Sequence, residues 1–495
     1  MAKYYLGLDQ GTTGVTTILF DENWQQVSRG YREIRQIYPQ SGWVEHDAMD
    51  IWDAARFAVQ QAMDNAGAAG SDILCIGLDH EGESVMLWDK ATGIPLYNTI
   101  VWQDRRTADA AQTLAAQYGD LIQSRTGLAV DSYFSALKLR WLLDNVPAAK
   151  NLLAQDRLAA GNMDAWLAWN ITGGVHATDP STASRTMLMN LRSCSWDEEV
   201  LALLDIPRSI LPQICDSAAP FGYADPHRFC GISAPLSGML NDQQAALFGQ
   251  TCFEPGSVKT TYGTGCFMLM NTGSKPVCST GGLVTTVGWR LNGETTYALD
   301  GGVYISGAAT QWLRDGLKII TSAAETEPMA RSVKDSGGVY FVPAFTGLAA
   351  PYWDSYARGM MIGITGGTQR EHIVRATLES TAYQVSDLLR AMEADSGVTI
   401  PAMRCDGGAV VNSFLMQFQS DILGLPIHIP QIRDTTALGS AFMAALGAGF
   451  VHSIDQLKDC WHLARTYEPQ MSADERAALL DGWHRAVERC RDWAK

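Results

Sequence analysis

Two stretches of the chain share one pattern of apolar and β-branched residues that a glycine and threonine turn interrupts. The first covers residues 4–20 and the second covers residues 257–270. Strand-like runs broken by such a turn predict a β-hairpin with a polar tip. Because the copies stand about half a chain apart, the sequence predicts an internal duplication into two related domains.

Other apolar runs, such as residues 73–78 and 339–343, alternate with helical patterns. Between Val374 and Met392 the apolar positions recur every three or four residues, which predicts a helix. Alternating strands and helices predict α/β layers. A Cys-Phe-Glu-Pro-Gly run at residues 252–256 interrupts the alternating pattern near the middle of the chain. We therefore predict domains at 1–250 and 251–495, with the active site in the cleft between them.

Composition narrows the class of protein. A chain of 495 residues is too long for one ordinary hydrophobic core, and 46% hydrophobic with 18% charged residues is typical of a globular protein. The net charge of −16, from 37 basic and 53 acidic residues, lacks the basic footprint of a nucleic-acid-binding protein. An anionic nucleotide remains compatible, because Mg²⁺ and backbone N–H groups supply local positive potential.

The chain carries no sign of export or membrane insertion. No basic and apolar leader opens it, and the longest apolar stretch, around Ala437 to Val451, is glycine-rich and contains Ser440, which predicts a buried helix. Ten scattered cysteines without a Cys-x-x-Cys pair predict a reduced, cytoplasmic protein.

The first candidate for chemistry is the hairpin tip that follows Asp9. Its glycine lets the backbone approach a phosphate, Thr12 and Thr13 offer donors, and Asp9 is well placed to hold Mg²⁺. The alternative is an ordinary β-turn. The second tip, which contains Thr264 and Gly265, favours two phosphate-binding hairpins that face each other across a cleft.

A third candidate is the strand ending that precedes Gly407 and Gly408. Paired glycines there allow a flat adenine or ribose to lie against the backbone. A tight strand-to-helix turn is the alternative, and on its own it is the better interpretation. The order of the three candidate elements along the chain favours nucleotide binding.

At this point the sequence resembles the FGGY carbohydrate kinases and, within them, the glycerol kinases. The resemblance implies two actin-like (ribonuclease H-like) α/β domains that close over ATP–Mg²⁺ and a polyol, and phosphorylation of glycerol to glycerol 3-phosphate. It covers nearly the whole chain. The stretches that carry it are Tyr38–Asp47, Tyr97–Thr107, Asp179–Leu188, Asp242–Gln250, Thr261–Gly273, Gly307–Asp315, Tyr340–Asp354 and Asp406–Leu423.

The resemblance also implies roles for single residues. Asp242 is the general base, although an Asp at this position is also typical of a helix N-cap. The aromatic candidates for the polyol site have core packing as their alternative. The implied polyol site consists of Glu83, Trp102, Tyr133, Asp242, Gln243 and Phe267. The implied nucleotide site consists of Thr12, Thr13, Thr264, Gly265, Gly307, Gln311, Gly408 and Asn412. The implied metal ligand is Asp9.

Four positions depart from the family pattern. Gly82 replaces an arginine that would bind a polyol hydroxyl, Thr16 replaces a cation near the phosphates, Asn241 replaces a glycine, and Gly366 replaces an arginine. Loss of a five-donor guanidinium removes hydrogen bonds and opens volume.

Three interpretations of these departures follow. The enzyme binds glycerol less tightly; it takes a larger polyol or keto-sugar, with Gly82 making room and His80 or Glu81 adding contacts; or it is a polyol-sensing paralogue without catalysis. Retention of Asp9, Asp242 and both hairpins favours an active kinase. The resemblance further implies a homo-oligomer, dimer or tetramer, with small-molecule partners and no nucleic acid or membrane.

Overall fold

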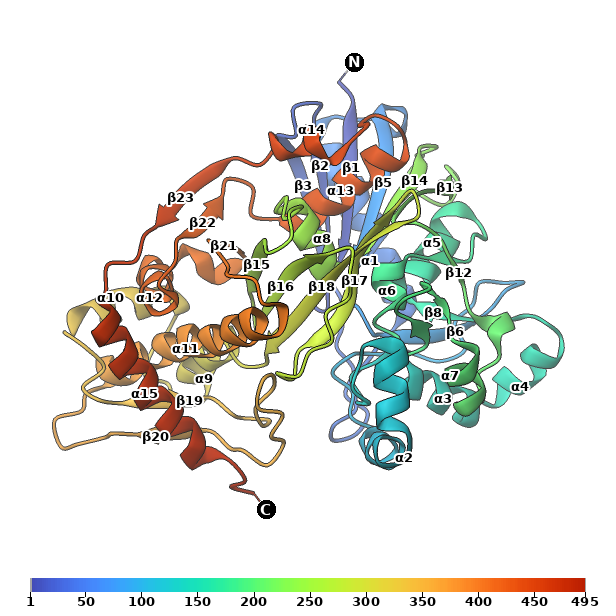
Figure 1. Ribbon diagram of the computed structural model, residues 1–495. Coiled ribbons are helices and arrows are strands. Elements are labelled where there is room, and N and C mark those ends of the chain that lie inside the picture. Colours follow the sequence, from blue (N-terminus) through green and yellow to red (C-terminus); the bar gives the residue numbers. More distant parts are fainter. Residues whose placement is uncertain (1, 495) are drawn as a thin grey trace.

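The computed structural model describes residues 2–494 and forms two α/β lobes that lie side by side (Figure 1). The helices are α1 (Ala48–Ala66), α2 (Ala108–Thr126), α3 (Ser135–Asn145), α4 (Pro147–Ala154), α5 (Met163–Thr172), α6 (Pro180–Ala183), α7 (Glu198–Leu203), α8 (Asp242–Gly249), α9 (Gly307–Asp315), α10 (Thr326–Ser332), α11 (Arg370–Ser396), α12 (Ser413–Leu423), α13 (Thr435–Gly447), α14 (Ile454–Lys458) and α15 (Ala473–Cys490).

The first lobe has a six-stranded sheet in the order β13-β14-β5-β1-β2-β3 and a smaller sheet in the order β4-β7-β6-β8. Strands β1, β5 and β14 are parallel, and the outer pairs are antiparallel. The strands are β1 (Tyr4–Gln10), β2 (Gly14–Phe20), β3 (Gln26–Glu33), β4 (Glu45–His46), β5 (Ile73–His80), β6 (Val85–Asp89), β7 (Thr99–Ile100), β8 (Leu158–Asn162), β13 (Ala218–Tyr223) and β14 (Pro235–Asn241).

The second lobe has a seven-stranded sheet in the order β17-β18-β16-β15-β21-β22-β23. Its strands β15, β21 and β22 are parallel, and their neighbours are antiparallel. Both sheets therefore pass from an antiparallel hairpin into three parallel strands and end on an antiparallel strand, which agrees with the predicted duplication. The strands are β15 (Val258–Tyr262), β16 (Cys266–Gly273), β17 (Val284–Leu291), β18 (Glu294–Val303), β21 (Met403–Asp406), β22 (Ile427–Pro430) and β23 (Leu463–Tyr467).

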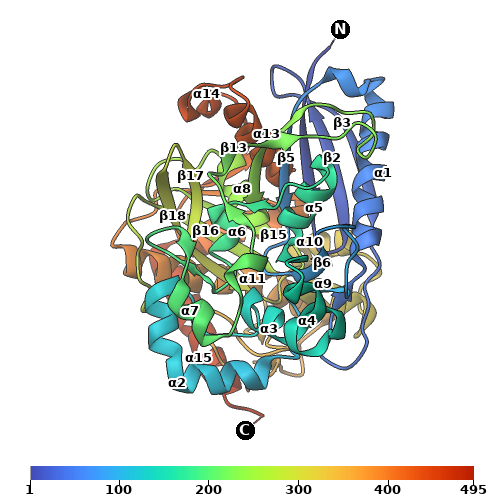
Figure 2. The same cartoon turned by 90° about the vertical axis from the view of Figure 1, so that its right-hand side faces the viewer.

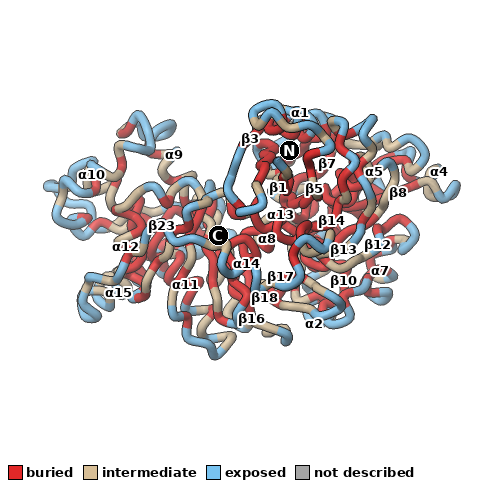
Figure 3. The backbone as a smooth tube through the Cα atoms, turned by 90° about the horizontal axis from the view of Figure 1, so that it is seen from above, coloured by how far each residue is buried: buried red, intermediate tan, exposed pale blue. Residues whose placement is uncertain are grey.

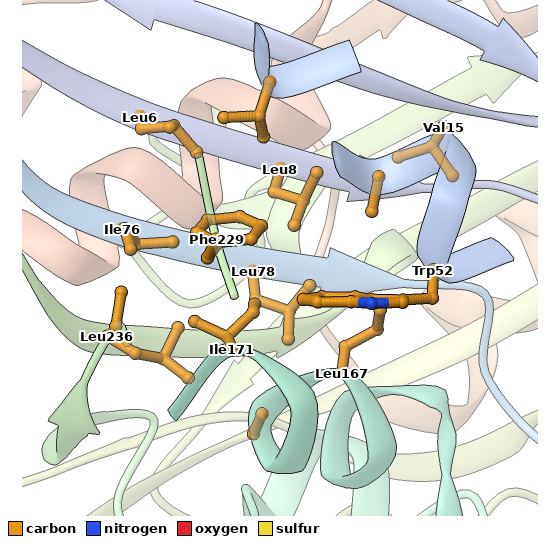
Figure 4. Close-up of a cluster of buried hydrophobic side chains, with 14 of the residues drawn as sticks. Leu6, Leu8, Val15, Trp52, Ile76, Leu78, Leu167, Ile171, Phe229 and Leu236 are labelled. Carbon is orange, nitrogen blue, oxygen red and sulfur yellow. The ribbon is translucent and has the colours of Figure 1, made fainter. Parts of the chain in front are cut away.

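One face of the first sheet buries an apolar core. Leucines at alternate positions of β1 point to the same side, as the two-residue period of a strand requires. Helices α1 and α5 cover this face, and Figure 2 shows α1 running alongside β2 and β3. The residues labelled in Figure 4 are Leu6, Leu8, Val15, Trp52, Ile76, Leu78, Leu167, Ile171, Phe229 and Leu236.

The opposite face of the first sheet is covered by α13, a helix from the other half of the sequence (Figure 1). A Cβ atom at Gly7 would lie 2.2 Å from the carbonyl oxygen of Ala437, and one at Gly77 would lie 2.0 Å from that of Ser440. The helix backbone therefore rests directly on the sheet, and only glycine leaves room for it. The contiguous division at residue 250 stays a prediction.

Buried backbone follows the sheets and the helices that cover them in both lobes, and exposed segments lie mostly around the outside (Figure 3). The predicted helix at residues 374–392 lies within α11, and the apolar stretch near residue 440 is the buried helix α13. Within residues 2–494, no helix has both the length and the apolar character that crossing a membrane requires.

Candidate active site

The tip of the first hairpin lies between β1 and β2, which pair antiparallel as predicted. The Gly11 N–H donates to the Gly14 carbonyl at 3.0 Å and closes the tip. Thr12 accepts a hydrogen bond on Oγ1 from the indole Nε1 of Trp102 at 3.0 Å. This bond joins the predicted phosphate hairpin to the predicted polyol wall.

The tip of the second hairpin rests on the N-terminus of α9. The Gly307 N–H donates to the Gly263 carbonyl at 3.1 Å, and the Ala308 N–H donates to the Thr264 carbonyl at 3.0 Å. A Cβ atom at Gly307 would lie 2.5 Å from the Gly263 oxygen, so glycine is required for this contact. Gln311 lies one turn further along α9 and is exposed.

The third predicted element lies beside the second hairpin. Gly407 has a φ of 90°, and its Cβ position would be 2.4 Å from the Tyr262 carbonyl oxygen. Gly408 is exposed, with open space at its Cβ position. Asn412 caps α12 by accepting from the Leu415 N–H at 3.0 Å. The turn is therefore tight, as the alternative interpretation held, and it also leaves a bare surface at Gly408.

Three aromatic side chains of the predicted polyol site come together. The ring of Trp102 meets that of Tyr133 edge-on at 5.7 Å and that of Phe267 at 6.4 Å between centroids. Trp102 and Tyr133 come from the first lobe, whereas Phe267 lies on β16, just after the tip of the second hairpin. The wall therefore forms across both halves of the chain.

The predicted polyol acceptor Glu83 is buried and paired with a residue that the sequence analysis did not single out. Arg185 donates from Nε to Glu83 Oε1 at 2.6 Å, and its Nη1 lies 2.9 Å from Asp300 Oδ2. Burial raises the pKa of Glu83, and the charge of Arg185 opposes that rise. Arg185 lies within one of the family-like stretches, which was a signal that it takes part in the site.

Asp242 begins α8, and the N-cap is Asn241, so the expectation that Asp242 itself caps the helix is wrong by one residue. Gln243 donates to Asp242 from its backbone N–H at 2.6 Å and from Nε2 at 3.1 Å. Burial raises the pKa of Asp242, while Gln243 and the buried cation Lys259 lower it. Lys259 also donates to Gln243 Oε1 at 2.5 Å and fixes its orientation.

Two more carboxylates, Asp9 and Asp79, end the adjacent parallel strands β1 and β5 and pair in register. Burial, followed by the charge of Asp242, raises the pKa of Asp9 to about 6. Burial and the charge of Asp9 hold the pKa of Asp79 well above its usual value, and a hydrogen bond from Ser440 opposes that rise. The sequence analysis missed Asp79, because only the strand order brings it beside Asp9.

This arrangement fits a cation with few protein ligands. Among residues 2–494, no group of three or more His, Cys, Asp or Glu side chains has the geometry of a metal cluster. Mg²⁺ needs only one or two carboxylates together with phosphate oxygens and water. The raised pKa values of Asp9 and Asp79 are what two adjacent buried carboxylates show when no positive charge lies between them.

The volume that the sequence predicts at Gly82 is not open. A Cβ atom at Gly82 would lie 2.1 Å from Nδ2 of Asn241, so the asparagine side chain fills that space. Two of the four departures from the family pattern are therefore in direct contact with each other.

The neighbours of Gly82 are also occupied. His80 faces the Glu81 carbonyl at 2.7 Å and the Thr182 hydroxyl at 2.9 Å. Glu81 lies 3.3 Å from His46 and accepts from Ser84 at 3.1 Å. Both ring nitrogens of His80 and the Oε1 atom of Glu81 thus already have partners, and contacts of His80 or Glu81 with a larger substrate stay a prediction.

The two remaining departures differ in setting. Arg29, on the neighbouring strand β3, donates to Thr16 Oγ1 at 3.2 Å, so a cation reaches the first hairpin from another position. Gly366 lies in an exposed turn with open space around its Cβ position.

Known proteins match the chain along most of its length. The model of the FGGY carbohydrate kinase N-terminal domain matches residues 4–249, and that of the C-terminal domain matches residues 258–448. Glycerol kinase 2 of Thermotoga maritima is 52% identical over 495 residues, which is 100% of both chains. The glycerol kinase of Symbiobacterium thermophilum is 53% identical over 99% of both chains.

Solved structures agree with the sequence comparison. The crystal structure of Plasmodium falciparum glycerol kinase with ADP superposes with a TM-score of 0.91, at 34% identity over 99% of this chain and 98% of that one. Gluconate kinase from Lactobacillus acidophilus shares the fold, with a TM-score of 0.88 at 21% identity over 99% of this chain and 98% of that one. The chain belongs to the FGGY family of carbohydrate kinases and has that family's actin-like α/β fold.

Proposed function

We propose that this protein transfers the γ-phosphoryl group of ATP to a terminal hydroxyl of glycerol and forms glycerol 3-phosphate. Relatives that are 52% and 53% identical over nearly the whole chain are named glycerol kinases. The observation that carries the proposal is the position of Asp242. Its charge raises the pKa of Asp9 on the phosphate side and of Glu83 on the polyol side, so it lies near both groups.

The two hairpin tips hold the phosphate groups in this proposal. Their backbone N–H groups, together with Thr12, Thr13 and Thr264, donate to phosphate oxygens. The wall for the ribose and base lies on α9 and beside the second hairpin in this proposal. It consists of Gly307, Gln311, Gly408 and Asn412. Phosphoryl transfer needs mainly such positioning, together with charge stabilisation.

We assign Mg²⁺ to Asp9, with Asp79 beside it. When bound, the ion offsets the negative charge of the phosphate oxygens. Thr436 donates to Asp9 Oδ2 at 3.1 Å and holds the carboxylate in place. The charges of Asp9 and Asp242 repel one another, so a cation at Asp9 also favours ionised Asp242.

Glycerol lies between Glu83 and Asp242 in this proposal. Glu83, fixed by Arg185, accepts hydrogen bonds from hydroxyls, and Trp102 and Phe267 cover the C–H face. Asp242 accepts the proton of the hydroxyl that attacks the γ-phosphorus. The Gln243 bonds to both Asp242 oxygens keep that carboxylate aimed at the acceptor.

Two alternatives remain as outcomes of the test. A larger polyol or keto-sugar would need the room that Asn241 fills at Gly82, which favours glycerol. A polyol sensor without catalysis would not need Asp242 to be held by Gln243, nor Gln243 to be fixed in turn by Lys259. We also propose a cytoplasmic homo-oligomer, dimer or tetramer, which sedimentation of the purified protein tests directly.

The test is a coupled ADP-release assay with Mg²⁺-ATP across glycerol, four- and five-carbon polyols and ketoses. We expect turnover on glycerol and a loss of about 10²–10⁴-fold in kcat for Asp242→Asn, because general base catalysis contributes that much. If the enzyme turns over only a larger polyol or ketose, that compound and not glycerol is its substrate. Binding without turnover on any acceptor would make the protein a sensor.

A further inference from the structure

Asn241 has a side-chain amide whose two ends face different groups. Its Oδ1 accepts the N-terminal N–H of Gln243 at 3.3 Å as the cap of α8. A capping bond needs an acceptor, so the oxygen must face the helix and the nitrogen must face away from it. Nδ2 is the atom that occupies the space beside Gly82.

That Nδ2 atom is buried and has no hydrogen-bond partner in the described part of the chain. Asn241 is only 2% exposed, so bulk water does not satisfy the group. Buried N–H donors are nearly always paired in native proteins, and an unpaired one calls for an explanation. Both ring nitrogens of His80 and the Oε1 atom of Glu81 are engaged with other residues.

The position of Asn241 explains what its donor serves. Asn241 directly precedes Asp242, and Gly82 directly precedes Glu83. The charge of Asp242 affects the pKa of Glu83, so these two carboxylates share one site. The sheet register places Asn241 beside His80, so the Nδ2 that occupies the space at Gly82 lies next to the chain segments that carry these two carboxylates.

We infer that Asn241 is a substrate-binding residue that sets specificity, and that its Nδ2 donates to a hydroxyl of the acceptor. Gly82 is the partner of this residue, because any larger side chain at position 82 would collide with the amide. The inference rests on the proposed function. It also names the acceptor class, since a neutral amide next to Asp242 in the chain and in contact with Gly82, which precedes Glu83, suits an uncharged polyol and disfavours a carboxylate-bearing sugar acid.

Four variants test the inference by steady-state kinetics with glycerol and gluconate. Asn241→Ser keeps a capping oxygen and loses the Nδ2 donor, so KM for glycerol rises by about tenfold while KM for ATP stays within about twofold of wild type. Gly82→Arg alone lowers kcat/KM for glycerol by at least about tenfold, because the new side chain meets Asn241. Asn241→Gly with Gly82→Arg recovers kcat/KM for glycerol relative to Gly82→Arg.

Gly366→Arg is the matched control, because it adds the same side chain in an exposed turn with open space. It is expected to leave both KM values unchanged. The thermal unfolding midpoint of each variant shows whether the substitution damages the fold. A purely structural effect would lower this midpoint and change the KM for glycerol and the KM for ATP together, whereas loss of the donor would raise only the KM for glycerol.

Two results would overturn the inference. One is an unchanged KM for glycerol in Asn241→Ser, and the other is a double variant no more active than Gly82→Arg. Either result with an active wild-type kinase leaves the proposed function standing. No turnover by the wild type on any polyol would instead overturn the proposed function itself.

Discussion

At the residue scale, the site is dominated by carboxylates that burial and mutual repulsion keep partly protonated. Asp9 has a pKa of about 6, and the pKa of Asp242 is raised by burial. Each must be ionised to act, Asp9 toward a cation and Asp242 toward the acceptor proton. Because of these raised pKa values, activity should increase as pH rises, whereas the contribution of Asp9 to the stability of the metal-free protein should decrease.

We expect activity to fall on acidification at a higher pH than ordinary aspartates would give. Both groups of the metal-free enzyme ionise only as pH rises through their raised pKa values, so kcat/KM for Mg²⁺-ATP should decline below about pH 6. A pH profile of kcat/KM for Mg²⁺-ATP at saturating polyol measures this limb, because it reports the enzyme before the cation binds. An acid limb that begins only near pH 4 would show that neither pKa is raised in the working enzyme.

Replacing Asp9 by Asn should stabilise the metal-free protein at neutral pH. The folded-state pKa of Asp9 exceeds its usual value of 3.8, so its contribution to stability is full below about pH 4 and is lost as pH rises through about 6. Asn keeps an acceptor for Thr436 and cannot ionise. Asp9→Asn should therefore exceed wild type by on the order of 2 kcal/mol at pH 8.

Denaturant titrations in EDTA at pH 4.5 and pH 8 measure this difference. The gap between Asp9→Asn and wild type should close toward the acidic end, because wild-type Asp9 is then protonated. A variant that is equally or less stable at pH 8 would contradict the assigned burial and repulsion.

Residue types in motifs were predictable from the sequence, but several partners were not. The roles proposed for Asp9 and Asp242 come from strand endings and family resemblance, and the structure brings Asp242 near both Asp9 and Glu83. The contact between Gly82 and Asn241 was hidden, because it joins the ends of two strands that only the sheet order makes neighbours. A small residue at position 82 that makes room for a larger one at position 241 leaves no signal in the sequence around either position.

At the element scale, the crossing of α8 and α13 connects the two halves of the site. Helix α8 begins with Asp242, and Thr436 of α13 holds Asp9. A Cβ atom at Gly439 would lie 1.9 Å from the carbonyl oxygen of Ala245, so the helices meet backbone to backbone. Close approach of this kind couples the two helices rigidly.

Gly439→Ala should destabilise the protein by about 2 kcal/mol or more, because the methyl group forces α8 and α13 apart. Gly119→Ala in the exposed helix α2 is the matched control, with nothing near its Cβ position. That control should gain about 0.5–1 kcal/mol from helix propensity. Thermal unfolding of both variants makes the comparison, and equal effects would contradict the tight crossing.

Local elements were largely predictable, whereas their docking was not. The hairpins at β1–β2 and β15–β16 and the helix α11 match the alternation and periodicity of the sequence. The apolar stretch of α13 predicted burial, but not that it packs on the sheet of the first half. Periodicity gives the face that is buried, while the partner depends on the tertiary topology.

At the scale of the whole molecule, two lobes with the same order of strand pairings carry one hairpin tip each. Trp102 of the first lobe contacts Phe267 of the second, so the polyol wall needs both. Phosphoryl transfer without loss to water requires that such a site exclude solvent when it is loaded. The account therefore predicts transfer to the acceptor and little hydrolysis of ATP.

The most direct test of this central claim is ³¹P NMR of the products formed from Mg²⁺-ATP and glycerol. We expect ADP and a glycerol phosphomonoester to accumulate in equal amounts, and little inorganic phosphate to form with or without glycerol. Inorganic phosphate as the main product, formed at the same rate without glycerol, would identify an ATPase and contradict the account.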